Sequence, residues 1–295
     1  MTSLAADQES ILYVRTVEIP DIPNLLALLP ADGGLAWING LATNQMGIVG
    51  WGEVTRSSFH GPERFSRAQR WWSQQCATSK GDEPIAFASF AFDKDPGNSV
   101  LVIPEVAIIR NQTGTRLTIT SDVAISDAQL AGVLSDINRP RVVSQGLNNV
   151  TWLPGSRPVS EWQSAVDSAV ARINAGELDK VVLARDIVAQ LDEPIHIGAL
   201  LIRLNESFPE CWTFCVDGLV GATPELLIRR DGEHVTSRVL AGTMRRSRDT
   251  DRDGQLAAEL LDSDKDQEEH VYAVESVAAA LATHCTDLNV PKSPF

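Results

Sequence analysis

The sequence has little positive charge, few cysteines and no long hydrophobic run. Its 295 residues include 25 lysines and arginines against 39 aspartates and glutamates, a formal net charge of −14. A surface this acidic repels the phosphates of nucleic acids and of anionic lipids, so the charge argues against both as partners. A small anionic ligand must therefore be attracted by a local group of cations or by a bound metal ion.

The four cysteines include no CxxC pair and do not form the dense framework of a secreted disulfide protein. Cys211 and Cys215 lie in a segment with the composition of a strand, where their spacing is too long for a disulfide. The N-terminus lacks the basic and apolar regions of a signal peptide, and the apolar stretch 22–30 is too short to cross a bilayer. We therefore expect a folded, water-soluble protein in the reducing cytoplasm.

The composition is otherwise that of a globular protein, with 43% hydrophobic and 22% charged residues. Residues 11–120 alternate short apolar segments with turn sequences, a pattern that predicts β-sheet. We expect 85–92 and 99–103 to be neighbouring strands, and 105–110 and 116–120 to form a hairpin. None of these segments carries a motif for catalysis.

A polar stretch at 144–150 marks a boundary between an N-terminal part, 1–150, and a C-terminal part, 151–295. Neither part contains an internal repeat or a low-complexity tract. The boundary therefore depends on the change in sequence pattern alone.

The C-terminal part opens with a predicted helix. Ser160 and Gln163 have the spacing of a capping box, and apolar residues follow at helical intervals until Gly176. The β-branched segment 180–189 then predicts a strand that begins with Lys180.

Two hairpins and a further helix complete the pattern. The dipeptides Asp217–Gly218 and Asp231–Gly232 favour tight turns, so we expect an antiparallel sheet here. Between them, the small residues and proline of 221–225 place Glu225 at the start of a strand. Residues 264–284 have the apolar stripe of a helix.

Four segments resemble the signature sequences of one family and occur in the family's order: Lys180–Arg185, Gly221–Leu227, Leu240–Thr243 and Lys265–His270. Each is a weak pattern alone, but together they make the chain similar to the chorismate-binding enzymes. The resemblance implies an α/β (α+β) fold of antiparallel sheets packed face to face, with helices outside and the active site in a cleft. It also implies that the two parts of the chain belong to one domain.

Members of this family that add water to chorismate carry a lysine at the position of Lys180, whereas those that add ammonia usually carry glutamine. A lysine can act as the base if a desolvated site lowers its pKa, and glutamine cannot accept a proton. The resemblance therefore implies isochorismate synthase chemistry. Lys180 activates water for attack at C2, and Glu225, its pKa raised by burial, protonates the departing C4 hydroxyl. The alternative is a structural ion pair between Lys180 and Glu225.

Glu269 resembles the family's first magnesium ligand. Asp266 lies one turn earlier, so two carboxylates point away from the apolar stripe of the helix. A solvated helix face has the same pattern, and the motif is what favours a metal. Magnesium here would supply the local positive charge that an acidic protein needs to bind a dicarboxylate.

Ala241, Gly242 and Thr243 match the family's substrate-binding turn. The glycine lets a carboxylate approach backbone N–H groups, and the threonine hydroxyl adds a donor. Without the other segments, Ala-Gly-Thr would be an ordinary turn. His270 follows the predicted metal ligand, but a single helical histidine is more typical of packing or of the surface, so we leave it out of the site.

Family members continue beyond the segment of Glu269 with a second magnesium glutamate, and with an arginine and a lysine for the substrate carboxylates. No segment before Phe295 matches these, so we expect a C-terminally truncated chain whose own activity is in doubt. The loss of the last strands should expose Val, Leu and Ile side chains over residues 180–243. The uncovered sheet edge should then promote non-specific association.

Two other functions stay open. A salicylate synthase of the same family shares Lys180 and Glu225 and then eliminates pyruvate, whereas an inactive remnant would only bind chorismate-like anions. For an isochorismate synthase, the sequence also leaves open whether the product serves menaquinone or siderophore biosynthesis.

Overall fold

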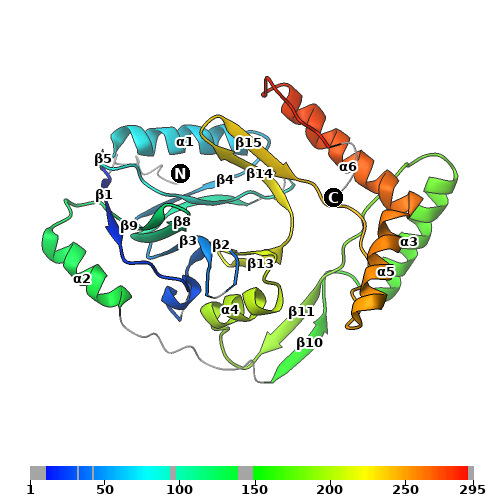
Figure 1. The fold of residues 1–295 in the computed structure, drawn as a ribbon, viewed down its shortest axis with the longest axis horizontal. Coiled ribbons are helices and arrows are strands. Elements are labelled where there is room, and N and C mark those ends of the chain that lie inside the picture. Colours follow the sequence, from blue (N-terminus) through cyan, green and yellow to red (C-terminus); the bar gives the residue numbers. More distant parts are fainter. Residues whose placement is uncertain (1–10, 32, 42, 94–97, 139–148, 292–295) are drawn as a thin grey trace, which may run out of the picture.

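The computed structural model describes residues 11–31, 33–41, 43–93, 98–138 and 149–291. Two sheets stacked face to face form the body of the molecule, and helices cover their outer faces (Figure 1). This arrangement confirms the predicted class of α/β fold with antiparallel sheets and outer helices.

The larger sheet has eight strands taken from both parts of the chain. In spatial order they are β13 (Leu219–Thr223), β12 (Trp212–Val216), β2 (Leu35–Asn39), β3 (Met46–Trp51), β8 (Val106–Asn111), β9 (Gly114–Ser121), β1 (Tyr13–Ile19) and β5 (Lys80–Gly81). Neighbouring strands are antiparallel except β1 and β5, which are parallel. Because β12 pairs with β2, the C-terminal part contributes strands to the sheet of the N-terminal part. Most of the predicted boundary segment, 144–148, lies outside the described residues.

The smaller sheet consists of β4 (Thr55–Phe59), β7 (Ser99–Ile103) and β6 (Phe87–Ser89), in that order. Side chains alternate between the two faces of β2, so Leu35 faces the smaller sheet while Ala36 and Ile38 face the other side. Leu35 packs with Phe87 and Val100, which closes a core between the sheets.

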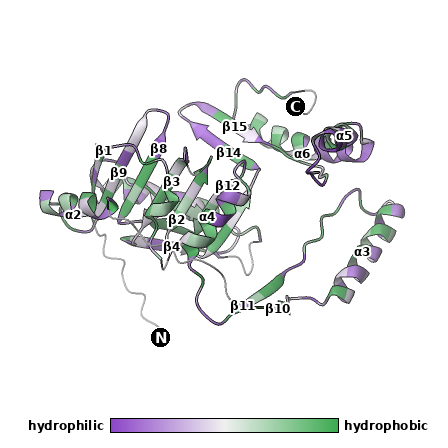
Figure 2. Cartoon of the chain, turned by 60° about the horizontal axis from the view of Figure 1, so that its bottom comes forward, coloured by the Kyte–Doolittle hydropathy of each residue, from purple (hydrophilic) through white to green (hydrophobic). Residues whose placement is uncertain are grey.

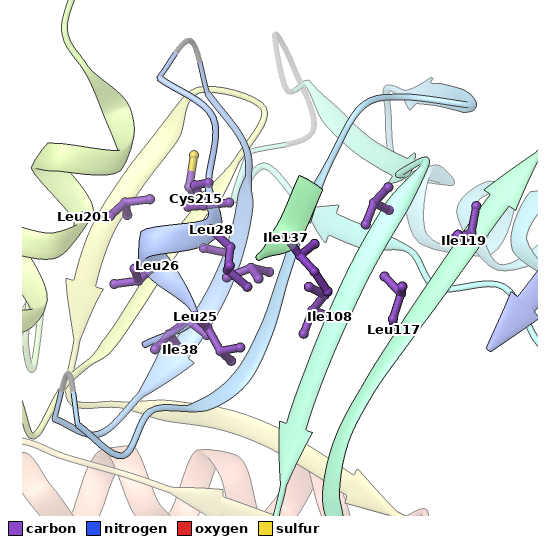
Figure 3. Packing of buried hydrophobic residues seen from close by; sticks show 14 residues of the cluster. Leu25, Leu26, Leu28, Ile38, Ile108, Leu117, Ile119, Ile137, Leu201 and Cys215 are labelled. Atoms are coloured by element: carbon purple, nitrogen blue, oxygen red, sulfur yellow. The ribbon is translucent and has the colours of Figure 1, made fainter. Parts of the chain in front are cut away.

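Helices complete two further cores on the outer faces. The short 3-10 helix η1 (Leu26–Leu28), α2 (Asp127–Ile137) and α4 (Ile197–Ser207) cover the larger sheet. Leu26, Ile137 and Leu201 are buried in this cluster (Figure 3), each at a gain of about 1.5–3 kcal/mol relative to an exposed side chain. α1 (Arg64–Thr78) covers the smaller sheet, where Ala68 packs on Phe59.

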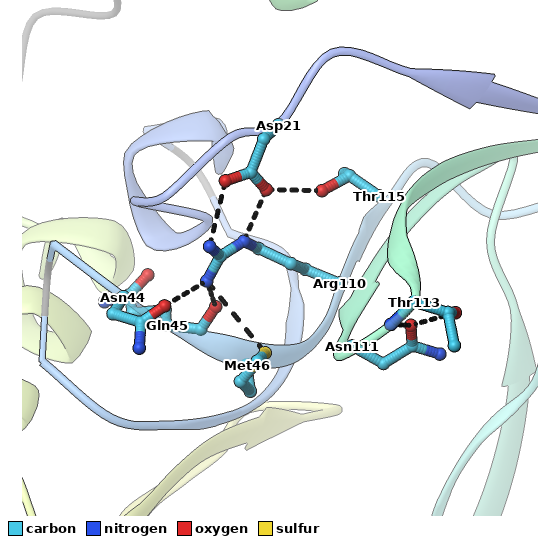
Figure 4. Close-up of polar contacts among 8 residues, drawn as sticks. All are labelled: Asp21, Asn44, Gln45, Met46, Arg110, Asn111, Thr113 and Thr115. Carbon is cyan, nitrogen blue, oxygen red and sulfur yellow. Dashed lines mark hydrogen bonds and ion pairs between the residues drawn. The ribbon is translucent and has the colours of Figure 1, made fainter.

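An ion pair fastens the connection after β1 to the larger sheet (Figure 4). Arg110 on β8 donates from Nε to Asp21 Oδ1 at 2.6 Å and from Nη2 to Oδ2 at 2.9 Å, and Thr115 Oγ1 donates to the same carboxylate. These hydrogen bonds, from Arg110 above all, lower the pKa of Asp21 from 3.8 to about 2. Arg110 Nη1 also donates to the carbonyl of Gln45 at 2.7 Å. One guanidinium therefore binds both the segment after β1 and the loop between β2 and β3.

The rest of the C-terminal part forms two ribbons and three helices outside these cores. They are the pair β10 (Val150–Pro154) and β11 (Ile187–Leu191), the pair β14 (Leu226–Asp231) and β15 (His234–Arg238), and the helices α3 (Val159–Asn174), α5 (Thr250–Leu261) and α6 (Asp264–Ala282). None of these seven elements buries a side chain fully. Figure 2 shows α3, α5 and α6 to one side of the two-sheet body, whereas β14 and β15 lie along its upper edge.

The predicted exposure of apolar side chains over 180–243 is confirmed. The exposed valines, leucines and isoleucines there are Val181, Val182, Leu183, Ile187, Val188, Ile195, Leu219, Leu227, Ile228, Val235 and Leu240. All four cysteines are free thiols, as expected. Within the described ranges, every helix is too short or too polar to span a membrane.

The local predictions for hairpins are confirmed. β6 pairs with β7, and β8 pairs with β9, close to the predicted bounds. β12 and β13 turn at Asp217–Gly218, where both residues have positive φ, and β14 and β15 turn at Asp231–Gly232. The predicted helix at 264–284 is α6.

The predicted strand at 180–189 is wrong over most of its length. Residues 180–186 are irregular, and β11 begins only at Ile187, opposite Pro154 of β10. Where this ladder ends, the Asp186 carboxylate accepts hydrogen bonds from Ser156 N and Oγ. β-branched residues favour a strand when a neighbouring strand is present, and no described strand lies beside 180–186.

The predicted capping box of α3 is also wrong. The helix begins at Val159, with Pro158 at the N-cap position and no side-chain cap. Proline has a fixed φ and lacks an N–H, so it starts this helix before Ser160 can do so.

Candidate active site

Lys180 lies in the irregular segment between α3 and β11. Gly176 follows the end of α3 with a left-handed backbone (φ 72°), as its predicted role at the helix end requires. The Lys180 ammonium pairs with Glu269 on α6, with 3.1 Å between Nζ and Oε1. The two side chains are 36% and 30% exposed, so solvent reaches the pair. The fold thus joins the predicted base to the predicted metal ligand.

The predicted substrate turn lies against the beginning of α6. Gly242 has a φ of 81°, and a Cβ atom there would lie 3.0 Å from the Cβ of Asp266. A glycine is therefore required both for the backbone conformation and for the close approach. Ser263 caps α6 by accepting from the Asp266 N–H, and its Oγ donates to Asp266 Oδ2 at 2.6 Å. Glu269 lies one helical turn further along.

Glu225 lies between β13 and β14, directly before the first residue of β14, and its side chain is exposed. Its N–H donates to Thr223 Oγ1 at 3.2 Å, which shapes this connection. The prediction that Lys180 begins a strand is wrong, because Lys180 lies in an irregular segment. The alternative of a structural Lys180–Glu225 ion pair is not observed either, since the carboxylate beside Lys180 belongs to Glu269.

The residues that the structure describes do not assemble a complete metal site. They contain no group of three or more His, Cys, Asp or Glu side chains arranged to hold a metal ion. The Glu269 carboxylate contacts the Lys180 ammonium, and the Asp266 carboxylate accepts from Ser263. Magnesium takes about six oxygen ligands in octahedral geometry. Glu269 can supply one of them, and the predicted magnesium stays a prediction.

Asp253 on α5 is a residue of this region that sequence reasoning missed. Its carboxylate accepts from Arg246 Nε and from the Ser247 N–H, each at 2.9 Å. The bond from Arg246, followed by that from Ser247, lowers the pKa of Asp253. The sequence offered one indication of this role: Asp253 lies in the first turn of α5, shortly after Asp249. Asp249 caps that helix by accepting a hydrogen bond from the Arg252 N–H. Acidic residues in a first helical turn are common for general electrostatic reasons, so this signal is weak.

These contacts gather an amine, a carboxylate and the N–H groups of a glycine turn along the first two turns of α6. Such groups can transfer protons and bind a small anion. Among the described hydrogen bonds and ion pairs, none joins Glu225 to Lys180, Glu269 or the turn 241–243.

The known proteins that resemble this chain are chorismate-binding enzymes and isochorismate synthases. A family model described as chorismate binding enzyme matches residues 3–295. Isochorismate synthase DhbC of Bacillus subtilis is 40% identical over 152 residues, which are 47% of this chain and 38% of that protein. Isochorismate synthase EntC of Escherichia coli K12 is 39% identical over 160 residues, which are 51% of this chain and 40% of that protein. The chain thus spans less than half the length of these curated relatives.

A crystal structure shows the same fold. A 2,3-dihydroxybenzoate-specific isochorismate synthase, DhbC from Bacillus anthracis, superposes with a TM-score of 0.68 at 27% identity, over 92% of this chain and 65% of that chain. Both the family match and the shared fold agree with the family resemblance of the four sequence segments. This chain is a member of the chorismate-binding enzyme family.

Proposed function

We propose that this chain is the core of an isochorismate synthase, an isomerase that converts chorismate to isochorismate. The observation that carries the proposal is the contact of Lys180 with Glu269 beside the turn 241–243, because it joins three of the four family segments. Two curated relatives, DhbC of Bacillus subtilis and EntC of Escherichia coli, are both named isochorismate synthases. A lysine at position 180 also favours the addition of water over that of ammonia.

The proposed reaction takes up one water molecule and releases another. The ammonium of Lys180 must first leave the Glu269 carboxylate and lose its proton. The deprotonated amine then accepts a proton from water while the water oxygen forms a bond to C2 of the ring. The ring double bond shifts, the C4–O bond breaks, and protonated Glu225 donates its proton to the departing hydroxyl, which leaves as water. Acid and base catalysis of this kind typically contributes about 10²–10⁴-fold in rate.

Lys180 and Glu225 do not need to touch in the free protein. They act on different carbons of one ring, so the substrate itself would lie between them. The burial expected for Glu225 is absent in the free chain, where its side chain is exposed. In the proposed reaction the bound substrate would have to enclose this carboxylate, because burial is what favours its protonated form.

Magnesium belongs to the proposal, with Glu269 as one ligand. A bound magnesium ion would supply the positive charge that a dicarboxylate substrate needs near a chain of net charge −14. Ala241, Gly242 and Thr243 would contact a substrate carboxylate through backbone N–H groups and the threonine hydroxyl. We also propose a cytoplasmic protein, for which the four free thiols are the support, serving either menaquinone or siderophore biosynthesis.

Product analysis tests the proposal. The test protein, here called the extended enzyme, is residues 1–295 joined to those residues of the Bacillus subtilis relative that have no counterpart in this chain. With chorismate and magnesium it should form isochorismate, separated by chromatography. Salicylate with pyruvate would establish the salicylate synthase alternative, and a folded extended enzyme that gives no product would contradict both.

A binding module without turnover is the second candidate function. It is favoured by the absence, among the described residues, of a cluster of three metal-binding side chains. Chorismate that binds to the extended enzyme and is recovered unchanged would support this function in place of catalysis.

A further inference from the structure

We infer that Asp253 is a positioning residue, which holds the turn 241–243 against α6 where a substrate would meet it. The link to substrate rests on the proposed function. The statement that Asp253 holds the turn depends only on contacts within this chain.

The turn is attached at its beginning through Gly242. The contact with Asp266 is so close that a single Cβ atom at Gly242 would come within 3.0 Å of the Asp266 Cβ and 3.1 Å of its Oδ1. Asp266 in turn is fixed by the cap that Ser263 makes at the start of α6. Packing on a fixed helix end thus defines where Gly242 lies.

The attachment at the other end is the Asp253 carboxylate. Arg246 contributes Nε at 2.9 Å and Nη2 at 2.7 Å, and the Ser247 N–H contributes a third donor. The Asp253 side chain is 20% exposed against 87% for Arg246, so the carboxylate is more protected from solvent than the guanidinium that it binds. Charge-assisted hydrogen bonds of this kind are stronger and more directional than neutral ones.

Only Met244 and Arg245 separate Thr243 from Arg246. Each residue of an extended chain spans about 3.3–3.6 Å, so an anchor at Arg246 leaves the turn little freedom. Asp253 and Asp266 lie on different helices, α5 and α6, and both hold the same short segment. Loss of the Asp253 anchor should therefore loosen Gly242 and Thr243, although Asp253 touches neither.

The competing explanation is that Asp253 only stabilises the first turn of α5, as acidic residues there often do. In that case its effect ends with Arg246, Ser247 and the helix itself. The two explanations differ in what happens to the N–H groups of Gly242 and Thr243.

Hydrogen exchange measured on residues 1–295 separates the two explanations. Asp253→Asn removes the charge and keeps the shape, and Asp253→Glu keeps the charge. Glu259→Gln is the matched control, because it breaks the exposed Arg252–Glu259 ion pair on the same helix and leaves the segment 241–247 untouched.

In Asp253→Asn, exchange at Gly242 and Thr243 should be about tenfold faster, since three hydrogen bonds to the carboxylate are weakened. Asp253→Glu should restore part of the protection, and Glu259→Gln should match the wild type. Faster exchange confined to 246–253, with Gly242 and Thr243 unchanged, would overturn the inference.

A second arm adds chorismate to the extended enzyme and to its Asp253→Asn variant. If the turn binds substrate, chorismate slows exchange at Gly242 and Thr243 in the wild type and does so less in Asp253→Asn at equal concentration. Failure of chorismate to protect the wild-type turn would count against the proposed function. The comparison without chorismate would still decide whether Asp253 holds the turn.

Discussion

At the residue scale, the Glu269 carboxylate has two cations to bind, the Lys180 ammonium in the structure and the magnesium ion of the proposal. Glu269→Ala in the extended enzyme should weaken magnesium binding at least about tenfold, since loss of even an indirect partner of a metal typically costs 10–100-fold. Titration calorimetry with magnesium chloride measures this directly. Glu268→Ala, which removes the neighbouring carboxylate on α6, is the control and should leave binding unchanged. If both variants bind magnesium like the wild type, Glu269 serves only as the partner of Lys180.

Asp21 provides a test of pH dependence at the same scale. Its pKa is lowered from 3.8 to about 2 in the folded chain, so the folded state favours the ionised carboxylate. Its contribution to stability is therefore complete above the unfolded pKa near 3.8 and is lost as the pH falls toward 2. Asp21→Asn should lower the free energy of unfolding near neutral pH and should flatten its decline below about pH 4.

Urea unfolding at several pH values checks this expectation. Asp127→Asn is the matched control, because it removes another Arg–Asp ion pair, with Arg15, whose aspartate is 92% exposed. Unfolding free energies of Asp21→Asn that fall in parallel with those of the wild type below pH 4 would show that the Arg110 network does not stabilise the fold.

At the scale of elements, the turn before α5 depends on one glycine. Gly242→Ala places a Cβ in a left-handed residue, at a cost of about 1–2 kcal/mol, and also against Asp266. Gly232→Ala carries the same backbone cost, with φ 60°, but its Cβ would meet no atom within 4 Å. In the extended enzyme, Gly242→Ala should raise the KM for chorismate, whereas Gly232→Ala should leave it unchanged. Equal KM values for both variants would mean that the contact with Asp266 does not shape the substrate site.

The elements that could be predicted from sequence are those that local contacts determine. Asp217–Gly218 and Asp231–Gly232 specify tight turns within a few residues, and α6 has its own cap in Ser263. The strand expected at 180–189 failed because its first residues have no partner strand in the described chain. A β-branched segment does not indicate whether a neighbour exists, and that depends on the path of residues far away.

The site shows the same division. The sequence motifs identified Lys180, Glu225, Glu269 and the turn 241–243. They did not show that Lys180 contacts Glu269, since that contact depends on the path of residues 180–186 after the end of α3. Asp253 was missed because its partners, Arg246 and Ser247, become visible only once α5 is placed.

At the scale of the whole molecule, the packed body and the outer elements differ in burial. Several apolar side chains on or beside the two outer ribbons are exposed to solvent. Two of them are Val182, which is 78% exposed, and Leu227, which is 75% exposed. Exposed apolar strands promote association, so residues 1–295 should elute from a sizing column as concentration-dependent oligomers. Val182→Lys together with Leu227→Lys should shift the protein toward monomer.

Light scattering during elution measures the mass in this experiment. Leu261→Lys, which changes an exposed leucine on α5 away from the ribbons, is the control and should not alter the distribution. A wild-type protein that stays monomeric at every concentration loaded would show that these side chains do not mediate self-association.

Lys180 is the proposed base for the addition of water to chorismate. This role can be tested by running the extended enzyme in water enriched in oxygen-18 and measuring the mass of the isochorismate formed. Each new isochorismate molecule should carry one oxygen-18 atom, and Lys180→Gln should give no product above background, while Lys80→Gln on β5 stays active. Isochorismate without the label, or labelled product formed by Lys180→Gln at the wild-type rate, would rule out Lys180 as this base.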